Sequence, residues 1–377
     1  MHVLIPALHR PTKPTGVCRH AVNLAQCLAE ATHVDRVTLL IGEWQKDYFE
    51  RSFELASSKI QTATVNIPNT SRSRNLWYLF GLPKVAEQLN PDIIHMSFPF
   101  PFVRRWFQAT VLATIHDLYP YEYPENFGYP RVWFNQLFLQ QCVSNSDGLS
   151  CVSQCTLDTL KHYFPSAVNC KPTAVIYNVV DFGQVVAKCP HQLINGGKIP
   201  FLLTVAQHRK NKNLNILIEA YDRLLQQGAL KPEMRLFLVG SSGPETISLT
   251  EQVKRLDLQE QVVFLAGLED AELRWLYENA SLFVIPSATE GFCLPLVEAL
   301  NCNCPVVCSD IPIFREVGGS RCIYFPLTEN AVNNLATAIT RQIDCPAAYS
   351  NELEVRFSKA NVSQELLSFY QILSALS

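Results

Sequence analysis

Two glutamates bracket an otherwise apolar segment that contains glycine and proline, residues 287–298, SATEGFCLPLVE. The apolar run before it, 282–286, is short, which predicts a buried strand. Pro295, followed by LVEAL, predicts the first turn of a helix with proline at its first position. Glu290 and Glu298 are therefore expected in a strand, loop and helix unit. The carboxyl end of a parallel strand that opens into a helix N-terminus is where α/β sheets bind ligands, anionic ones especially.

A cation and a histidine stand in comparable places elsewhere in the chain. Lys212 ends the basic stretch RKNK, 209–212, and His116 closes the apolar run 111–116, with Asp117 next to it. A lysine on such a loop can supply a fixed positive charge to a ligand, and a histidine at a strand end can reach one. The alternatives are a lysine on an exposed loop and a structural histidine.

The elements that must position these side chains are short apolar runs that alternate with amphipathic stretches. In the first half the expected strands are 3–7, 37–41, 92–95, 111–116, 148–152 and 174–177. In the second half they are 201–206, 235–240, 262–265, 282–285 and 305–308. Strands separated by helical segments indicate βαβ units. The sequence therefore predicts an α/β protein with two Rossmann-like domains, whose parallel sheets face each other across an interdomain cleft that can hold a ligand.

The length supports two domains, because 377 residues exceed what one hydrophobic core normally organises. Residues 181–199 include CPH and NGGK and show no clear period, which predicts a linker. We expect an N-terminal domain at 1–180 and a C-terminal domain at 200–358. The final segment, 359–377, has helical periodicity from about residue 361 and predicts a C-terminal helix that returns to the N-terminal domain.

Composition narrows the class of protein. Apolar residues make up 48% of the chain, charged residues 17%, and the net charge is -3, which is typical of a folded protein and does not favour a nucleic-acid binder. No apolar run approaches the roughly 18 residues of a membrane span. The opening MHVLIPA predicts a first strand rather than a signal peptide. We expect a cytoplasmic protein.

The thirteen cysteines are scattered through expected strands and helices, which favours reduced, mostly buried thiols. The cluster Cys302, Cys304 and Cys308 is the one candidate for a metal site. A structural zinc normally needs two spaced pairs of ligands, and no second pair stands nearby. We therefore predict no metal ligands.

These motifs carry a family resemblance. The chain resembles retaining glycosyltransferases of family 4, also called glycosyltransferase group 1, which have the GT-B architecture of two Rossmann-like domains. Residues 290–298, EGFCLPLVE, are similar to the family's two glutamates separated by seven residues. The stretches 205–214, VAQHRKNKNL, and 238–243, LVGSSG, resemble the first two loops of its C-terminal domain. In the first half, 114–118, TIHDL, and 175–181, VIYNVVD, resemble its histidine-aspartate loop and the entrance to its linker.

The resemblance implies roles for individual residues in binding a nucleotide diphosphate sugar. Glu298 would accept hydrogen bonds from the ribose hydroxyls and Glu290 from the donor-sugar hydroxyls, since carboxylates suit paired hydroxyl donors. Lys212 would carry positive charge to the diphosphate, and His116 would hydrogen-bond the donor sugar. The implied catalytic residues are thus His116, Glu290 and Lys212. The implied substrate-binding residues are Gly16, Asp117, Arg209, Gly291, Phe292, Cys293, Leu294 and Glu298, with Asp117 either orienting His116 or capping the next turn.

The resemblance also implies a reaction, in which a hexose moves from the nucleotide sugar to a hydroxyl of a glycan or glycolipid with retention of configuration. The N-terminal domain would be the acceptor side and the C-terminal domain the nucleotide-sugar side. No Asp-x-Asp stretch is present, so Lys212 and helix dipoles are expected to replace an obligatory metal ion, and no cofactor is expected. The segment 116–125, HDLYPYEYPE, resembles mannosyltransferases of surface polysaccharide synthesis, which makes GDP-mannose the first donor expected.

Some positions depart from the family's pattern. A residue with a side chain stands where glycine is common at Thr15, Val179, Cys293 and Asn303. Such a side chain can obstruct close backbone approach or left-handed geometry. The glycine and arginine of the first C-terminal loop are replaced by Ala206 and Gln207, so that Arg209 or Lys210 would have to compensate. The changes at Thr15 and Cys293 are expected to reshape the donor pocket or weaken activity, while the family's pattern as a whole is kept.

Several alternatives stay open. A basic and aromatic group in the first half could contact an anionic membrane surface, although solvated arginines beside partly buried tryptophans are favoured. Its members are Arg72, Arg74, Trp77, Arg104, Arg105 and Trp106. The other candidate functions are a non-catalytic nucleotide-sugar-binding protein and another sugar-nucleotide enzyme on the same fold, such as an epimerase or a phosphorylase.

Overall fold

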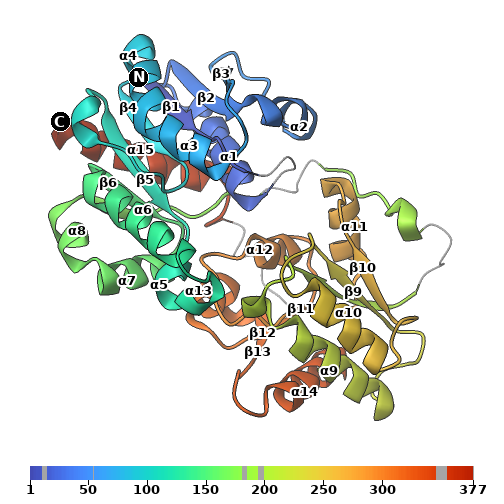
Figure 1. Cartoon of the computed structure of the whole chain (residues 1–377). Helices are drawn as coiled ribbons and strands as arrows, with labels where there is room; N and C mark the ends of the chain where they lie inside the picture. Colours follow the sequence, from blue (N-terminus) through green and yellow to red (C-terminus); the bar gives the residue numbers. More distant parts are fainter. Residues whose placement is uncertain (11–14, 54, 181–184, 194–198, 345–354, 377) are drawn as a thin grey trace. The chain divides into compact units, whose positions relative to one another are not determined.

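The computed structural model describes residues 1–10, 15–53, 55–180, 185–193, 199–344 and 355–376. The chain divides into two compact units (Figure 1). Unit 1 comprises Met1–Val179 and Val355–Ser377, and unit 2 comprises Val180–Glu354. The expected linker, 181–199, thus falls entirely within the range of unit 2, and its residues 181–184 and 194–198 lie outside the described residues.

Within the described residues, unit 1 contains a seven-stranded parallel sheet in the order β3-β2-β1-β4-β5-β6-β7. Its strands are β1 (His2–Pro6), β2 (Arg36–Gly42), β3 (Ile60–Val65), β4 (Ile93–Met96), β5 (Thr110–Ile115), β6 (Gly148–Cys151) and β7 (Thr173–Val175). The central strands are apolar and buried on both faces, as expected for a parallel sheet covered by helices. The order reverses between β1 and β4, which pair directly.

Helices cover both faces of this sheet. They are α1 (Gly16–Glu30), α2 (Lys46–Ser52), α3 (Ser71–Leu76), a π-helical segment (Trp77–Gly81), α4 (Leu82–Leu89), α5 (Tyr119–Glu122), α6 (Arg131–Asn145), α7 (Gln154–Tyr163), α8 (Pro165–Cys170) and α15 (Lys359–Leu376). In α1, apolar residues recur at helical spacing, at Cys18, Val22, Ala25 and Leu28, and all four are buried in the core.

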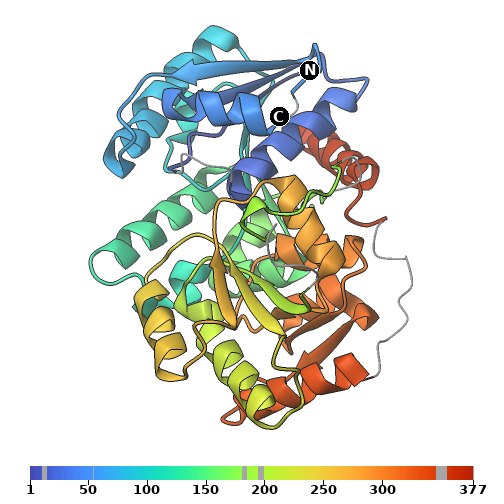
Figure 2. The same cartoon turned by 90° about the vertical axis from the view of Figure 1, so that its right-hand side faces the viewer.

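The C-terminal helix α15 packs on unit 1, beside α1, as Figure 2 shows in red and blue. Leu366, Phe369 and Leu373 join the core of that unit. Leu373 lies so close to Gly148 of β6 that a Cβ on the glycine would meet it at 2.6 Å. Tyr370 contributes a hydrogen bond between its hydroxyl and Nδ1 of the buried His95, 2.7 Å long. The helix is therefore an integral layer of unit 1.

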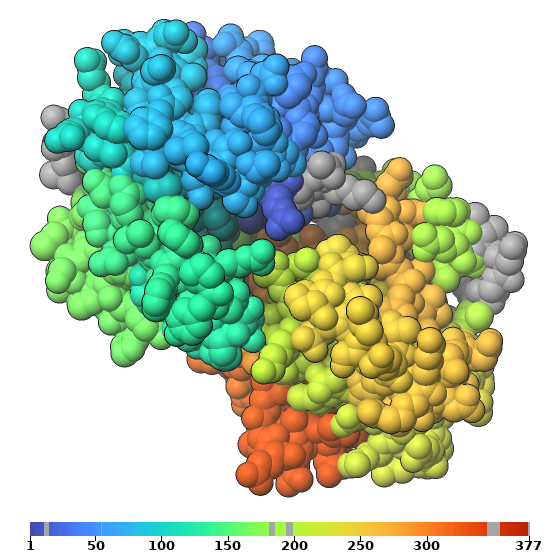
Figure 3. All heavy atoms as spheres, in the orientation of Figure 1, coloured from blue at the N-terminus to red at the C-terminus, as the bar shows by residue number. Residues whose placement is uncertain are grey.

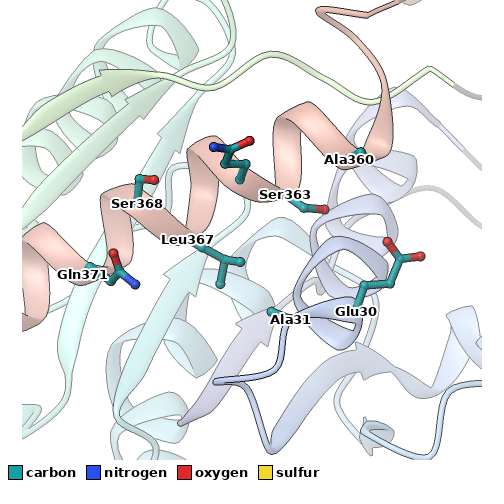
Figure 4. A pocket seen from close by; sticks show the side chains of 8 residues that line it. Glu30, Ala31, Ala360, Ser363, Leu367, Ser368 and Gln371 are labelled. Carbon is teal, nitrogen blue, oxygen red and sulfur yellow. The ribbon is translucent and has the colours of Figure 1, made fainter.

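A shallow hollow of about 360 Å³ lies along α15 and the end of α1 (Figure 4). Glu30, Ser363, Leu367 and Gln371 are among the residues that line it. Glu30 also forms an ion pair with Lys359, with 2.5 Å between Oε1 and Nζ. None of the residues predicted for a ligand site lines this hollow.

Within the described residues, unit 2 contains a six-stranded parallel sheet in the order β10-β9-β8-β11-β12-β13. Its strands are β8 (Phe201–Val205), β9 (Arg235–Val239), β10 (Val262–Leu265), β11 (Leu282–Ile285), β12 (Val306–Ser309) and β13 (Cys322–Phe325). As in unit 1, the order reverses beside the first strand, between β8 and β11. Ligands bind outside the carboxyl ends of the strands at such a reversal.

The helices of unit 2 are α9 (Leu214–Gln226), α10 (Thr246–Arg255), α11 (Asp270–Asn279), α12 (Leu294–Asn301), α13 (Pro312–Gly318) and α14 (Ala331–Asp344). Helices α9, α10 and α14 share one core with Leu282 and Val284 of β11. Phe283 points to the opposite face, since side chains alternate along a strand, and its ring contacts Tyr277 of α11. The sheet is therefore covered on both sides.

The predicted α/β fold of two Rossmann-like domains is confirmed by these sheets. Two strands escaped prediction, β3 and β13, and each is an outermost strand of its sheet. In β3 three of the six residues are exposed and the other three are only partly buried, and its sequence, IQTATV, lacks the apolar run of a central strand.

The cysteines and the hydropathy can be checked in the part of the chain that the structure describes. The twelve cysteines there are free thiols, Cys302, Cys304 and Cys308 included. No group of three or more His, Cys, Asp or Glu residues among the described residues is arranged to hold a metal ion. Within the same ranges, no helix has the length and apolar character needed to cross a membrane.

Candidate active site

The candidate site of unit 2 lies where its strand order reverses. The loop after β8 contains a short 3-10 turn, Lys210–Lys212, and then opens into α9. The loop after β11, residues 286–293, opens into α12. Because β8 and β11 are paired and parallel, both loops leave the same edge of the sheet. Two of the predicted catalytic residues, Lys212 and Glu290, lie on these loops.

Lys212 and Glu290 form an ion pair. Nζ of the lysine lies 2.5 Å from Oε1 of the glutamate, and their side chains are only 18% and 13% exposed. Burial by itself lowers the pKa of Lys212, but the charge and hydrogen bond of Glu290 outweigh it, and the net pKa is raised. The lysine therefore keeps its positive charge over the whole physiological range. The structure thus brings the cation predicted for a diphosphate next to the carboxylate predicted for a sugar.

Two asparagines that were not predicted as site residues tie these loops together. Asn213 donates from Nδ2 to the carbonyl of Pro286, 2.9 Å away, and adopts a left-handed backbone with φ 48°, which asparagine tolerates well. Asn211 donates to the carbonyl of Thr289 at 3.3 Å, and its own carbonyl accepts from the backbone N–H of Ala288 at 2.8 Å. The stretch KNKN, 210–213, is the sequence feature that could have pointed to these asparagines, because each of them directly follows a lysine of the loop.

The beginning of the β8 loop packs against the next loop, which follows β9. A Cβ on Gly240 would lie 1.9 Å from the carbonyl oxygen of Ala206, and one on Gly243 would lie 2.2 Å from that of His208. His208 is buried and its Nδ1 is 2.9 Å from the Thr246 hydroxyl. Arg209, predicted to bind substrate, is exposed at the end of this packed segment.

Glu298 lies in the second turn of α12 and is buried. Its Oε2 accepts a hydrogen bond of 3.0 Å from the hydroxyl of Tyr277, a fully buried residue of α11. Sequence reasoning did not identify Tyr277, because nothing in the run LYEN distinguishes it from an ordinary core tyrosine. The second predicted glutamate is therefore held from the neighbouring helix.

The residues between the two glutamates form the entrance to α12. Phe292 is buried, Gly291 and Leu294 are partly exposed, and Cys293 has a left-handed backbone with φ 70°. The helix begins at Leu294, so Pro295 is its second residue and not its first, as the sequence had suggested. Proline is still accommodated there, since the first N–H groups of a helix have no intrahelical partner.

Cys293 and Asn303 stand where glycine is common in the family, and their backbone conformations show what the added side chains meet. Both have positive φ, 70° and 53°, so the left-handed geometry that glycine favours is kept despite the side chains. Thr15, by contrast, has an extended backbone with φ -133° directly before α1, and Val179 is buried. Of the four positions where glycine is common, the two beside α12, Cys293 and Asn303, are therefore the ones with a left-handed backbone, which is strained for a residue with a side chain.

In unit 1, His116 follows β5 and packs among other rings. Its Nε2 donates to the carbonyl oxygen of Ser97 at 2.8 Å, and its ring lies 4.6 Å from that of His20, edge to face. Phe98 stacks on it with centroids 5.9 Å apart. Burial lowers the pKa of His116, against the opposing effects of the Ser97 carbonyl and the Asp117 charge. A neutral ring that donates through Nε2 keeps Nδ1 as an acceptor.

His20 was not predicted, although it stands one helical turn after Gly16, the first residue of α1. Its Nδ1 donates to Oδ1 of Asn178 at 2.7 Å, which is the asparagine of the VIYNVVD stretch. Its buried Nε2 has no hydrogen-bond partner among the described residues. Burial lowers the pKa of His20 well below its usual range, so the ring is neutral.

Asp117 makes a hydrogen bond to the turn that follows it. Its side chain is exposed, and Oδ1 accepts a hydrogen bond of 3.1 Å from the backbone N–H of Tyr119. Tyr119 is the first residue of α5, so this contact is of the kind expected if Asp117 caps the following turn.

Comparison with known proteins identifies chains similar to this one. Residues 14–184 match the family model described as Glycosyltransferase Family 4, and residues 190–363 match the one described as Glycosyl transferases group 1. The O-antigen chain mannosyltransferase RfbU of Salmonella typhimurium is 26% identical over 93% of this chain and 94% of its own. The O-antigen chain mannosyltransferase B of Escherichia coli is 26% identical over 81% of each.

The fold has solved counterparts as well. The sucrose-phosphate synthase of Thermosynechococcus elongatus is similar over 100% of both chains, with a TM-score of 0.75 and 18% identity. Anabaena HepE, solved with UDP and glucose, covers 100% of this chain and 99% of its own, with a TM-score of 0.65 and 20% identity. The two parallel sheets and these matches define a glycosyltransferase of the GT-B fold, a hexosyltransferase. The chain is a GT-B glycosyltransferase whose first half matches Glycosyltransferase Family 4 and whose second half matches Glycosyl transferases group 1.

Proposed function

We propose that the protein transfers mannose, with retention of configuration, from a nucleotide diphosphate sugar to a hydroxyl of a glycan or glycolipid acceptor. The observation that carries the proposal is the Lys212–Glu290 pair at the reversal of the unit 2 sheet, 2.5 Å between Nζ and Oε1. A diphosphate sugar presents an anion next to hydroxyl groups, and this pair presents a cation next to a hydroxyl acceptor.

The leaving group needs stabilisation, because the bond between the anomeric carbon and the diphosphate oxygen breaks as the bond to the acceptor oxygen forms. Lys212, held positive beside Glu290, and the positive end of α12 supply charge to the departing diphosphate. The acceptor proton passes to the released diphosphate oxygen. No protein nucleophile is assigned, and we propose that no metal ion is obligatory because Lys212 supplies the charge.

His116 is proposed to hydrogen-bond the donor sugar. Its Nε2 is engaged by Ser97, and the neutral ring offers Nδ1 as an acceptor for a sugar hydroxyl. The packing of His20 and Phe98 against the ring fixes its plane. A fixed acceptor selects one hydroxyl orientation of the donor.

The choice of mannose and of a lipid-linked acceptor rests on the relatives. RfbU and mannosyltransferase B are named as O-antigen chain mannosyltransferases. A Campylobacter jejuni relative, 26% identical over 54% of each chain, is named for transfer to a diphospho-undecaprenol-linked saccharide. We therefore place GDP-mannose first among donors and a polyprenyl-diphosphate-linked glycan first among acceptors.

We also propose that unit 1 touches the membrane that carries such an acceptor. Helices α3 and α6 lie on the same side of unit 1 (Figure 1), and their segments are exposed together in Figure 3. Phe80 and Trp106 are exposed, with ring centroids 5.8 Å apart, and α6 exposes Trp133 and Phe134. Aromatic side chains of this kind insert at the boundary between headgroups and acyl chains.

The basic part of this surface is smaller than the sequence suggested. Arg72 and Arg105 are exposed. Arg74, however, is buried, and Arg104 forms an ion pair with Asp147 at 2.7 Å.

Flotation with vesicles of phosphatidylglycerol, compared with vesicles of phosphatidylcholine, tests whether unit 1 binds an anionic membrane. Trp133→Ser with Phe134→Ser is expected to abolish flotation, whereas Ile247→Ser, at an exposed apolar residue of unit 2, is not; equal flotation of all three proteins would contradict a membrane role for α6.

The transfer itself is tested with a panel of GDP-, UDP- and ADP-hexoses and polyprenyl-diphosphate-linked acceptors. Turnover of GDP-mannose, with an α-linked product by proton NMR and undiminished rate in EDTA, is the expected result. A β-linked product would contradict retention, and a rate lost in EDTA and restored by a divalent cation would contradict the metal-independent charge balance. Tight nucleotide binding without turnover of any donor would indicate a binding protein instead.

A further inference from the structure

Tyr277 is the fully buried partner of the predicted ribose-binding glutamate. It stands on α11, and its hydroxyl lies 3.0 Å from Oε2 of Glu298, on α12. Its ring packs edge to face on Phe283 of β11, with centroids 5.2 Å apart and planes at 85°. The aromatic ring is thus packed in the core of the sheet, and its hydroxyl contacts Glu298.

The direction of this hydrogen bond follows from the chemistry of the two groups. A carboxylate accepts only, so the tyrosine hydroxyl donates. Burial, together with the charge of Glu298, raises the pKa of Tyr277 well above its ordinary value, and the proton stays on the hydroxyl. A hydrogen bond to a charged acceptor in a buried place is stronger and more directional than one between neutral groups.

We propose that Tyr277 is a positioning residue for nucleotide binding: by holding Oε2 of Glu298 from α11, it fixes the carboxylate plane so that Oε1 meets the ribose hydroxyls. The proposal rests on the proposed function, in which Glu298 binds the ribose. It assigns specificity for a ribonucleotide to a contact between two helices rather than to Glu298 alone.

A core tyrosine elsewhere in the same unit shows what a purely structural hydroxyl does. Tyr221 of α9 is equally buried, and its hydroxyl donates to the backbone carbonyl of Met234 at 2.7 Å. A backbone carbonyl satisfies a buried hydroxyl without involving any ligand. The partner of Tyr277 is instead the carboxylate of a predicted site residue, which is why the two tyrosines are a matched pair for experiment.

The test measures the affinity of the whole protein for GDP, UDP and ADP and for their 2′,3′-dideoxy forms by calorimetry. For the nucleotide that binds best, Tyr277→Phe is expected to weaken the ribo form about tenfold and to leave the dideoxy form unchanged, on the scale of one charge-assisted hydrogen bond. Tyr221→Phe is the control for loss of a buried hydroxyl, and it should leave the ratio of the two affinities at the wild-type value.

A second variant separates positioning from packing. Glu298→Gln is expected to lower the ribo preference itself, and adding Tyr277→Phe to it should lower the preference no further. An unchanged ribo-to-dideoxy ratio in Tyr277→Phe would overturn the proposal. A wild-type protein that binds both forms equally would overturn it together with the ribose role of Glu298, while leaving sugar transfer intact. Failure of the wild-type protein to bind any nucleoside diphosphate would instead overturn the proposed function on which the inference rests.

Discussion

Lys212 and Glu290 form an ion pair, with 2.5 Å between Nζ and Oε1, across the two loops that follow β8 and β11. Each side chain neutralises the other in a mostly buried place, so removal of either one leaves an unpaired charge. The pair therefore links the stability of unit 2 to the chemistry of the site.

A double-mutant cycle with Lys212→Met and Glu290→Gln should show this coupling. We expect an interaction free energy of about 1 to 2 kcal/mol from chemical denaturation, between the values for exposed and for fully buried pairs. Because both residues are proposed to bind the donor, each single variant is also expected to lose about 100-fold in transfer rate. Additive stability effects would show that the two charges do not interact in solution.

Gly240→Ala should destabilise unit 2 and impair the site. A Cβ at this position would lie 1.9 Å from the Ala206 carbonyl oxygen, so the loop that leads to Lys212 must shift. The expected loss is about 2 to 4 kcal/mol in the free energy of unfolding. Gly228→Ala is the control, since Gly228 has φ 68° but no atom within 4 Å of its Cβ position, and it should cost about 1 kcal/mol. Equal costs for the two variants would contradict the close packing of the two loops.

Cys293 should tolerate glycine better than alanine. Its φ of 70° strains any residue that has a Cβ, by about 1 kcal/mol. Glycine removes both the thiol and the strain, whereas alanine removes the thiol and keeps the strain. Cys293→Gly is therefore expected to be about 1 kcal/mol more stable than Cys293→Ala in denaturant titrations. Greater stability of the alanine variant would indicate that the backbone before α12 is not left-handed.

The buried histidines of unit 1 make its stability depend on pH. Burial lowers the pKa of His95 to about 3, while in the unfolded chain a histidine has a pKa of about 6.5. As the pH falls from 6.5 towards 3, the unfolded chain binds a proton that the folded one does not, and the free energy of unfolding falls by about 1.4 kcal/mol per pH unit. This contribution of His95 is complete above pH 6.5.

Thermal unfolding between pH 7 and pH 5 checks this prediction. His95→Gln should show a shallower loss of melting temperature than the wild-type protein, and His162→Gln, at an exposed histidine of α7, should not. A wild-type melting temperature that is constant from pH 7 to pH 5 would contradict the neutral, buried state of His95.

The fold was predictable because apolar runs of central strands are a strong local signal. The strands β8 and β11 and the helix after Cys293 follow from such runs and from Pro295. The edge strand β3 was missed because one side of it meets solvent and its sequence shows no continuous run.

The site was predictable only in part. Lys212 and Glu290 were named because their motifs resemble the family, but their direct contact depends on the pairing of β8 with β11, which no local pattern encodes. His20 and Tyr277 were missed for the same reason: each acquires its role from a partner far along the chain, Asn178 and Glu298.

The most direct test of the account compares the rate of sugar transfer from GDP-mannose by the wild-type protein, by Glu290→Gln and by Glu251→Gln, a change at an exposed glutamate of α10. We expect turnover by the wild-type and Glu251→Gln proteins and a rate reduced about 100-fold in a folded Glu290→Gln protein. Equal rates for all three proteins would contradict the central claim that the Lys212–Glu290 pair holds the donor.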